Sequence, residues 1–215
     1  MTSTKKRTAR GDGFGTHGWL IVGGVVTAVL LAGIIAIATT VGRNSATDSG
    51  VAQTRPVAIL GDALPGFVSS GGDAAVGMAA PVVAGFTFAG EQLMIQPGVP
   101  TAVVFLAHWC PHCQREVPVL TEWERSGGVP EGVQVIGVAT DTDIALPNFP
   151  PSRWLDREEF PFPVIADSDS SEAAAAFGLS GFPFTVVLDS SGNVVQRISG
   201  EFEPDLLGSL LAAAG

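Results

Sequence analysis

The sequence predicts an α/β domain preceded by a single membrane-spanning helix. Two patterns carry this prediction: an uncharged stretch at residues 19–41, and compact apolar runs alternating with helical stretches from residue 81 onward. The 215 residues are 46% hydrophobic and only 15% charged, which is enough to bury a core and is unlike the composition of a disordered chain.

The membrane segment reads WLIVGGVVTAVLLAGIIAIATTV over residues 19–41. At 1.5 Å per helical residue it is long enough to cross a hydrocarbon core of about 30 Å. A cleaved secretory signal usually has a shorter apolar region of about 7–15 residues, so the length favours an uncleaved signal-anchor. Four basic residues and one acidic residue precede it. The positive-inside rule therefore places residues 1–18 in the cytoplasm and the rest of the chain outside the cell membrane.

The charge balance is acidic, with a formal net charge of −10. Beyond the membrane segment there are seven Arg, no Lys and 20 acidic residues. A nucleic-acid partner needs a basic footprint, so this class of partner is excluded. We interpret the acidic surface as solvation only.

Residues 42–80 are rich in Gly, Ser, Ala and Asp and show no sustained period. This composition predicts a flexible extracytoplasmic linker, with room for one short ordered piece at residues 57–60. Residues 81–215 then form the α/β domain.

The first part of the domain reads as a hairpin, a buried strand and a helix. Residues 82–88 and 92–95 flank the turn Ala89-Gly90 and predict two paired strands. Residues 101–106, TAVVFL, are apolar and β-branched, as in a buried strand. A helix is expected to follow at about residues 110–125.

The middle of the domain continues with VQVIGVA at residues 133–139, a second buried strand. A long loop with three prolines follows, then a short helix at about residues 152–159 and a short strand at 163–166.

The last part begins with the Ala-rich residues 171–177, a helix that Gly178 ends as a C-cap. Residues 184–189 and 194–199 flank the turn Ser-Ser-Gly-Asn and predict a second hairpin. The final helix opens at Pro204, since proline suits the first helical turn.

The only two cysteines are Cys110 and Cys113, directly after a predicted buried strand and at the start of a helix. This spacing is typical of a thiol redox site, because the two sulfurs can close a small ring by thiol–disulfide exchange. The helix N-terminus stabilises a thiolate at Cys110. A purely structural disulfide is the weaker interpretation, since so small a ring removes little loop entropy.

A metal site is the other alternative for this loop, with His108, Cys110, His112 and Cys113 as ligands. Four neighbours on one short loop rarely close a site without ligands from elsewhere, and the only other histidine is His17, before the membrane segment. We therefore expect no metal and no cofactor, and His108 as a surface loop residue.

Three neighbours of the cysteines are candidates for tuning them. Pro111 costs no hydrogen bond at a first helical position, and the His112 imidazole can donate to the Cys110 thiolate or be simply an exposed helix residue. A more stable thiolate makes the disulfide a stronger oxidant. Glu116, three residues beyond Cys113, shares its helix face and is either a proton carrier for that thiol or a solvated first-turn acid.

Two stretches of the chain resemble the thioredoxin superfamily, and within it the membrane-anchored TlpA/ResA-like thiol-disulfide oxidoreductases of extracytoplasmic redox and cytochrome c maturation. The first is VVFLAHWCPHCQREVPVL, with Trp109, Cys110, Cys113, Glu116 and Pro118 at the motif positions. The second is FGLSGFPFTVVLDSSGNVVQRISG, with its cis-proline at Pro183. The resemblance covers about residues 80–215.

The resemblance implies a thioredoxin-like fold, with a central mixed sheet and flanking helices, and a role for each matching residue. Cys110 would be the nucleophile and Cys113 the resolving thiol of the redox-active disulfide, and Glu116 would move the Cys113 proton. Pro183 would hold the substrate strand, Trp109 would shape the surface beside Cys110, and Phe182 would bind the partner backbone.

At three positions this chain differs from the families that it resembles. Val104 occupies the place of the buried Asp of cytoplasmic thioredoxins, the Pro111-His112 dipeptide is that of DsbA-type oxidants, and Phe182 is bulkier than the usual residue before the cis-proline. The peroxiredoxin motif Pro-x-x-x-Thr-x-x-Cys does not occur around Cys110, which argues against peroxidase activity.

The function predicted from these observations is disulfide exchange with protein substrates outside the membrane. We expect a TlpA-type reductase, recharged by a membrane thiol donor because the outside offers no soluble reducing pool. A DsbA-like oxidase is the alternative that the active-site dipeptide favours. A copper-handling binding protein and an adaptor that merely retains the fold are the alternatives from other classes.

Overall fold

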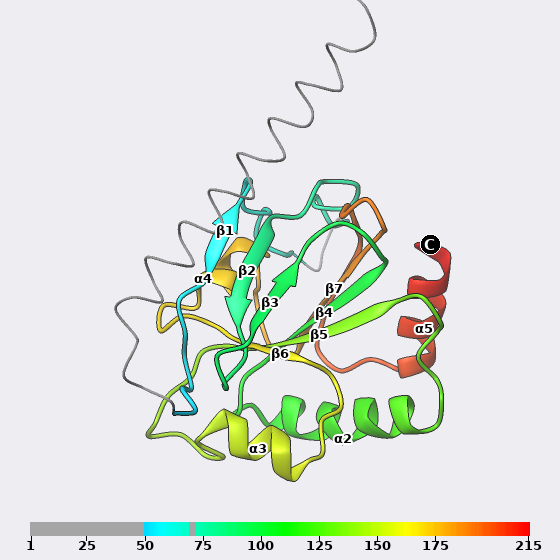
Figure 1. Ribbon diagram of the computed structural model, residues 1–215. Coiled ribbons are helices and arrows are strands. Elements are labelled where there is room, and N and C mark those ends of the chain that lie inside the picture. The colour runs from blue at the N-terminus through cyan, green and yellow to red at the C-terminus, as the bar shows by residue number, and fades with distance from the viewer. Residues whose placement is uncertain (1–49, 69–71) are drawn as a thin grey trace, which may run out of the picture. The chain divides into compact units, whose positions relative to one another are not determined.

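A computed structural model describes residues 50–68 and 72–215 (Figure 1). A small antiparallel sheet has the order β1-β2-β3, and the central sheet has the order β6-β5-β4-β7-β8. The strands are β1 (Ala58–Leu60), β2 (Val82–Phe86), β3 (Gln92–Ile95), β4 (Thr101–Leu106), β5 (Gln134–Ala139), β6 (Val164–Ala166), β7 (Phe184–Leu188) and β8 (Val194–Ser199). The helices are α2 (Pro111–Arg125), α3 (Pro151–Arg157), α4 (Glu172–Ala176) and α5 (Pro204–Ala213).

The central sheet is mixed, as a thioredoxin-like fold requires. β4, β5 and β6 run parallel, whereas β7 is antiparallel to β4 and β8 is antiparallel to β7. Every residue of β4 and β7 is buried, because both faces of the sheet are covered. The run TAVVFL is therefore apolar throughout, and the predicted buried strand is confirmed.

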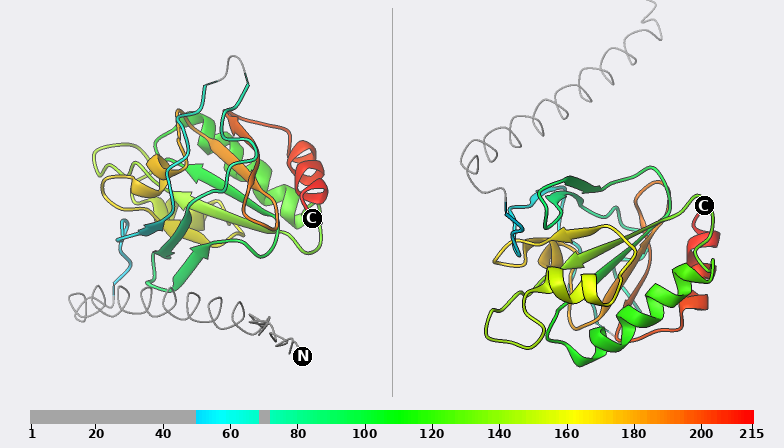
Figure 2. Two further views of the ribbon diagram at one scale, coloured as in Figure 1. Left: turned by 90° about the horizontal axis from the view of Figure 1, so that it is seen from above. Right: turned by 60° about the horizontal axis from the view of Figure 1, so that its bottom comes forward.

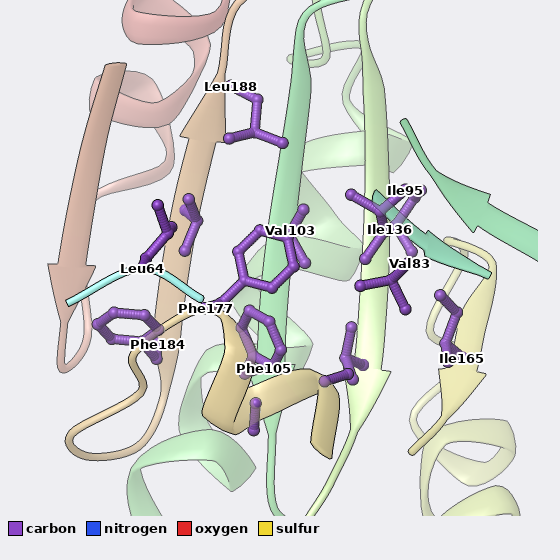
Figure 3. Close-up of a cluster of buried hydrophobic side chains, with 14 of the residues drawn as sticks. Leu64, Val83, Ile95, Val103, Phe105, Ile136, Ile165, Phe177, Phe184 and Leu188 are labelled. Carbon is purple, nitrogen blue, oxygen red and sulfur yellow. The ribbon is translucent and has the colours of Figure 1, made fainter. Parts of the chain in front are cut away.

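Each face of the central sheet has its own apolar cluster. Val103 and Phe105 point to the cluster that includes α4 and the small sheet, where Phe105 packs on Phe177 with ring centroids 5.4 Å apart (Figure 3). Ala102 and Val104 point to the other cluster, which includes α2, α3 and α5. The right-hand view of Figure 2 shows α2 and α5 side by side on that face.

The predicted elements are found in the predicted order, with small shifts at their ends. β2 ends at Phe86, two residues before the expected end, since a turn begins at Thr87. Proline occupies the first turn of α2, α3 and α5, where no intrahelical bond is lost. Gly178, the expected stop of α4, has φ +70°.

The linker expected over residues 42–80 is wrong for much of its described part. The short ordered piece allowed for at residues 57–60 is present as β1, which pairs with β2 through Ala58 and Ala84. Beyond it, Leu64 is buried, and its backbone N–H donates to the Ala176 carbonyl at 2.8 Å. Contacts with residues far away in the chain order this stretch. The absence of a hydrophobic period in its sequence therefore did not indicate that it is flexible. The domain begins well before residue 81.

The predicted membrane-spanning helix at 19–41 and the basic tail at 1–18 lie outside the described residues. Within residues 50–68 and 72–215, no helix has the length and apolarity needed to cross a membrane.

Candidate active site around Cys110 and Cys113

The fold brings three chain segments to one end of the central sheet. α2 begins just after β4 ends, and β7 begins just after Pro183. Because Phe105 near the end of β4 pairs with Phe184 at the start of β7, the cysteine loop and Pro183 share this end. The turn between β8 and α5 completes it, since the Gly200 N–H donates to the Pro183 carbonyl at 2.8 Å.

Cys110 is the N-cap of α2, with extended backbone at φ −74° and ψ 119°. Its Sγ accepts a hydrogen bond from the Cys113 backbone N–H at 3.5 Å, and Pro111 follows at the first helical position. Both thiols are free, and Cys110 is 5% exposed whereas Cys113 is fully buried. Cys110 is therefore the sulfur that a partner can reach.

Cys113 needs a base before it can react. Burial raises the pKa of its thiol far above the ordinary value, and the nearby charges of Cys110 and Glu116 act in the same direction. The thiol thus keeps its proton at neutral pH, and only a group beside it can take that proton away.

Glu116 is such a group. Its side chain is buried, and burial raises its pKa to about 7, helped by the charges of Glu201 and Glu203 and opposed by the backbone amide of Phe202. Its Oε1 has no hydrogen-bond partner among the described residues. The position expected for Glu116, near Cys113, is confirmed, and the solvated-acid alternative is wrong.

The expected cis-proline is present, because the Phe182–Pro183 peptide bond is cis. The Phe182 ring meets the Trp109 ring edge to face, with centroids 5.8 Å apart. The Trp109 Nε1–H donates to the Asp141 carbonyl at 2.8 Å. Trp109 and Phe182 thus form one aromatic surface beside the cysteines.

Of the two interpretations of His112, the structure shows the exposed helix residue and not the donor to Cys110. The ring is exposed, and its Nδ1 lies 2.6 Å from Glu201 Oε1 and 2.8 Å from an Nη atom of Arg115, with no hydrogen bond to Cys110 Sγ among the described residues. Sequence reasoning missed Glu201 and Arg115. Nothing local signals this contact, since Glu201 is far from α2 in the chain.

His108 is buried, at 1% exposure, and the expectation of a surface residue is wrong. Its Nδ1 lies 2.6 Å from the Pro147 carbonyl, so this nitrogen donates, and its Nε2 accepts from the Asp143 N–H at 3.2 Å. The loop after β5 therefore wraps over the ring and uses both ring nitrogens.

A metal centre finds little support in this geometry. Among residues 50–68 and 72–215, no three His, Cys, Asp or Glu side chains lie close enough together to hold a metal ion. Both ring nitrogens of His108 are engaged in loop contacts, so His108 is not available to the four-ligand set of His108, Cys110, His112 and Cys113.

Comparison with known proteins agrees with this chemistry. The Redoxin family matches residues 75–210. The thiol:disulfide interchange protein DsbE homolog of Paracoccus denitrificans (strain Pd 1222) is 33% identical over 144 residues, which cover 65% of this chain and 70% of that protein.

Two further similarities extend the comparison. The thiol-disulfide oxidoreductase ResA of Bacillus thuringiensis subsp. konkukian (strain 97-27) is 32% identical over 98 residues, 45% of this chain and 53% of that protein, so the match spans about half of that relative. A crystal structure of a thiol:disulfide interchange protein from Chlorobium tepidum TLS superposes with a TM-score of 0.53 at 26% identity, covering 66% of this chain and 99% of that one.

Proposed function

Because the chain belongs to the Redoxin family, we propose that it exchanges disulfides with protein substrates outside the cytoplasm, in the reducing direction. It is a thiol-disulfide oxidoreductase of the thioredoxin superfamily, similar to DsbE and ResA. The observation that carries the proposal is the buried Glu116 carboxyl beside the buried Cys113 thiol, behind a reachable Cys110; among the described residues the Glu116 Oε1 has no hydrogen-bond partner.

The first step uses Cys110. Its thiolate attacks one sulfur of a substrate disulfide, the substrate S–S bond breaks, and the other substrate sulfur leaves as a thiolate. A mixed disulfide now joins Cys110 to the substrate. Pro183 and the aromatic surface of Trp109 and Phe182 lie where the substrate segment would pass.

The second step uses Cys113 and Glu116. The Glu116 carboxylate takes the Cys113 proton, and the new thiolate attacks Cys110 Sγ, which breaks the mixed disulfide. The second substrate sulfur leaves and takes up a proton. The substrate has gained two electrons and two protons, and Cys110 and Cys113 have become a disulfide.

The surroundings of Cys110 support the reducing direction. The Pro111-His112 dipeptide would favour an oxidant if the imidazole stabilised the Cys110 thiolate. In the structure Glu201 engages both His112 and Arg115, so the guanidinium charge of Arg115 is compensated by a carboxylate. A less stabilised thiolate makes the pair more reducing. The DsbA-like oxidase remains the second candidate, on the strength of that dipeptide.

The proposed location rests on the sequence. An anchor at residues 19–41 with basic residues before it would hold the domain at the outer face of the cell membrane. After each turnover the disulfide would need two electrons from a membrane thiol donor, since no soluble reducing pool exists outside. Cytochrome c maturation or general redox homeostasis is the process we propose it serves.

The test is the reduction potential of the Cys110–Cys113 pair in the full-length chain in detergent. Reduced and oxidised forms are counted by thiol alkylation and mass after equilibration with glutathione or thioredoxin buffers. A potential near that of thioredoxin, about −270 mV, supports the reductase. A potential near that of DsbA, about −120 mV, overturns it in favour of the oxidase. A pair that cannot be cycled would refute both.

A further inference from the structure

Glu201, in the turn between β8 and α5, contacts the side chains of Arg115 and His112 of α2. Its Oε1 lies 3.0 Å from Arg115 Nε, 2.5 Å from an Nη atom of the same guanidinium, and 2.6 Å from His112 Nδ1. All three side chains are well exposed, so none of these contacts is needed to fill the core.

The turn that carries Glu201 contacts the rest of the site as well. The Gly200 N–H binds the Pro183 carbonyl, and the Phe202 amide faces the Glu116 carboxylate and lowers its pKa. Glu201 is therefore held in place by backbone contacts on either side of it. It acts on two residues, His112 and Arg115, that lie within the first two turns of α2 after Cys110.

Arg115 responds to both Glu201 and Cys110. Its pKa is raised mainly by the hydrogen bond to Glu201, and the Cys110 thiolate adds a contribution of the same sign. Arg115 lies in the second turn of α2 after Cys110, and the carboxylate that it contacts is that of Glu201. The titratable groups that face Arg115, Glu201 and Glu116 are His112 on α2 and Glu203 in the turn.

We propose that Glu201 is a positioning residue for the thiol exchange, which holds Arg115 and His112 on the turn and so keeps the Cys110–Cys113 pair reducing. Loss of the carboxylate removes a negative charge and frees Arg115, which is always protonated, to face the Cys110 sulfur. The thiolate then becomes more stable, and with it the reduced state of the pair.

The expected size is modest because these side chains are solvated. We expect the loss of one solvated charge near this site to change the equilibrium constant for reduction of the pair about threefold. At 29.6 mV per tenfold change, threefold corresponds to about 14 mV.

The experiment compares Glu201→Gln with the wild-type chain and with Glu124→Gln, a control that removes an exposed carboxylate elsewhere on α2. Two quantities are measured: the ratio of reduced to oxidised pair at a fixed glutathione ratio, and the rate of Cys110 alkylation by iodoacetamide as a function of pH. Glu201→Gln should raise the ratio of reduced to oxidised pair about threefold and move the pH profile of Cys110 alkylation to lower pH. Glu124→Gln should change neither.

The route through Arg115 has its own test. Arg115→Gln should shift both readouts in the opposite direction, and Glu201→Gln should have a smaller effect in that background than alone. Equal effects in both backgrounds would overturn the role of Arg115 and with it the proposal.

The role of Glu201 rests on the proposed function, but different experimental results would overturn the two. A wild-type pair that cycles, together with a Glu201→Gln pair of unchanged ratio and alkylation profile, overturns the inference alone. A wild-type pair that cannot be cycled overturns both. Thermal unfolding of each variant checks that the shift does not come from a loosened fold.

Discussion

Arg197 of β8 and Asp73 form a buried ion pair that ties the chain before β2 to the central sheet. Arg197 Nε donates to Asp73 Oδ2 at 2.8 Å, a second contact joins Nη to Oδ1, and the guanidinium is fully buried. The other Nη atom donates to the Pro65 and Phe177 carbonyls at 2.8 and 3.0 Å. One side chain therefore binds three chain segments.

Asp73→Asn is expected to destabilise the fold markedly, because it leaves the Arg197 charge buried without its partner. Removing one member of a buried pair costs about 3 kcal/mol or more. Urea unfolding of the two proteins measures the difference. Glu122→Gln, which breaks the exposed pair with Arg125, is the matched control and should cost less than about 1 kcal/mol. Equal losses in the two variants would contradict the buried role of Arg197.

The same pair predicts an acid-sensitive component of stability. The hydrogen bond from Arg197 holds the pKa of Asp73 below its ordinary value, against a smaller opposing effect of burial. A carboxyl with a lowered folded-state pKa stabilises the fold above its unfolded value of about 3.9, and this stability is lost as the pH falls through the folded value. The unfolding free energy of wild type should thus fall below about pH 4 more steeply than that of Asp73→Asn. Parallel curves would count against this assignment.

The sequence predicts the elements and the cysteine site well, and long-range polar contacts poorly. Short sequence motifs identify Cys110, Cys113 and the turn at Pro183. These motifs can be recognised without knowing which distant segments the fold brings near them. Arg197 and Glu201 have no such pattern, since their partners lie in distant segments and are chosen by the folded chain. For the same reason the aperiodic sequence before residue 81 predicts a linker, although Asp73 and Leu64 anchor this stretch to the domain.

We expect the buried His108 ring to hold the loop after β5 in place. His108→Leu keeps a similar volume but leaves the Pro147 carbonyl and the Asp143 N–H without their partners, which costs about 1–3 kcal/mol for each group that stays buried. Limited proteolysis should cut the variant faster between residues 141 and 150. His112→Gln, a change at an exposed ring, is the control and should leave this cleavage rate as in wild type. No difference in cleavage would mean that the ring does not hold the loop.

Because the Glu116 carboxyl is buried, we expect the free energy of unfolding to fall as the pH rises. Burial raises its folded-state pKa to about 7, above the unfolded value, so the unfolded chain ionises first. The cost is absent below about pH 4 and complete above about pH 7. Glu116→Gln should therefore raise the free energy of unfolding more at pH 8 than at pH 4. Denaturant titrations at the two pH values test this, and an equal effect at both would show that the carboxyl is not desolvated.

Glu116→Gln also isolates the second chemical step. The amide cannot accept the Cys113 proton, so the mixed disulfide on Cys110 should form at nearly the wild-type rate but resolve about 100-fold more slowly near neutral pH. Quenched mixing of the reduced chain with a disulfide peptide, followed by mass analysis, measures both steps. The wild-type resolution rate should rise with pH through about 7, as Glu116 becomes able to take a proton. In Glu116→Gln that rise should be missing, while Glu124→Gln should behave as wild type. A Glu116→Gln chain that resolves at the wild-type rate would mean that solvent, and not this carboxylate, deprotonates Cys113.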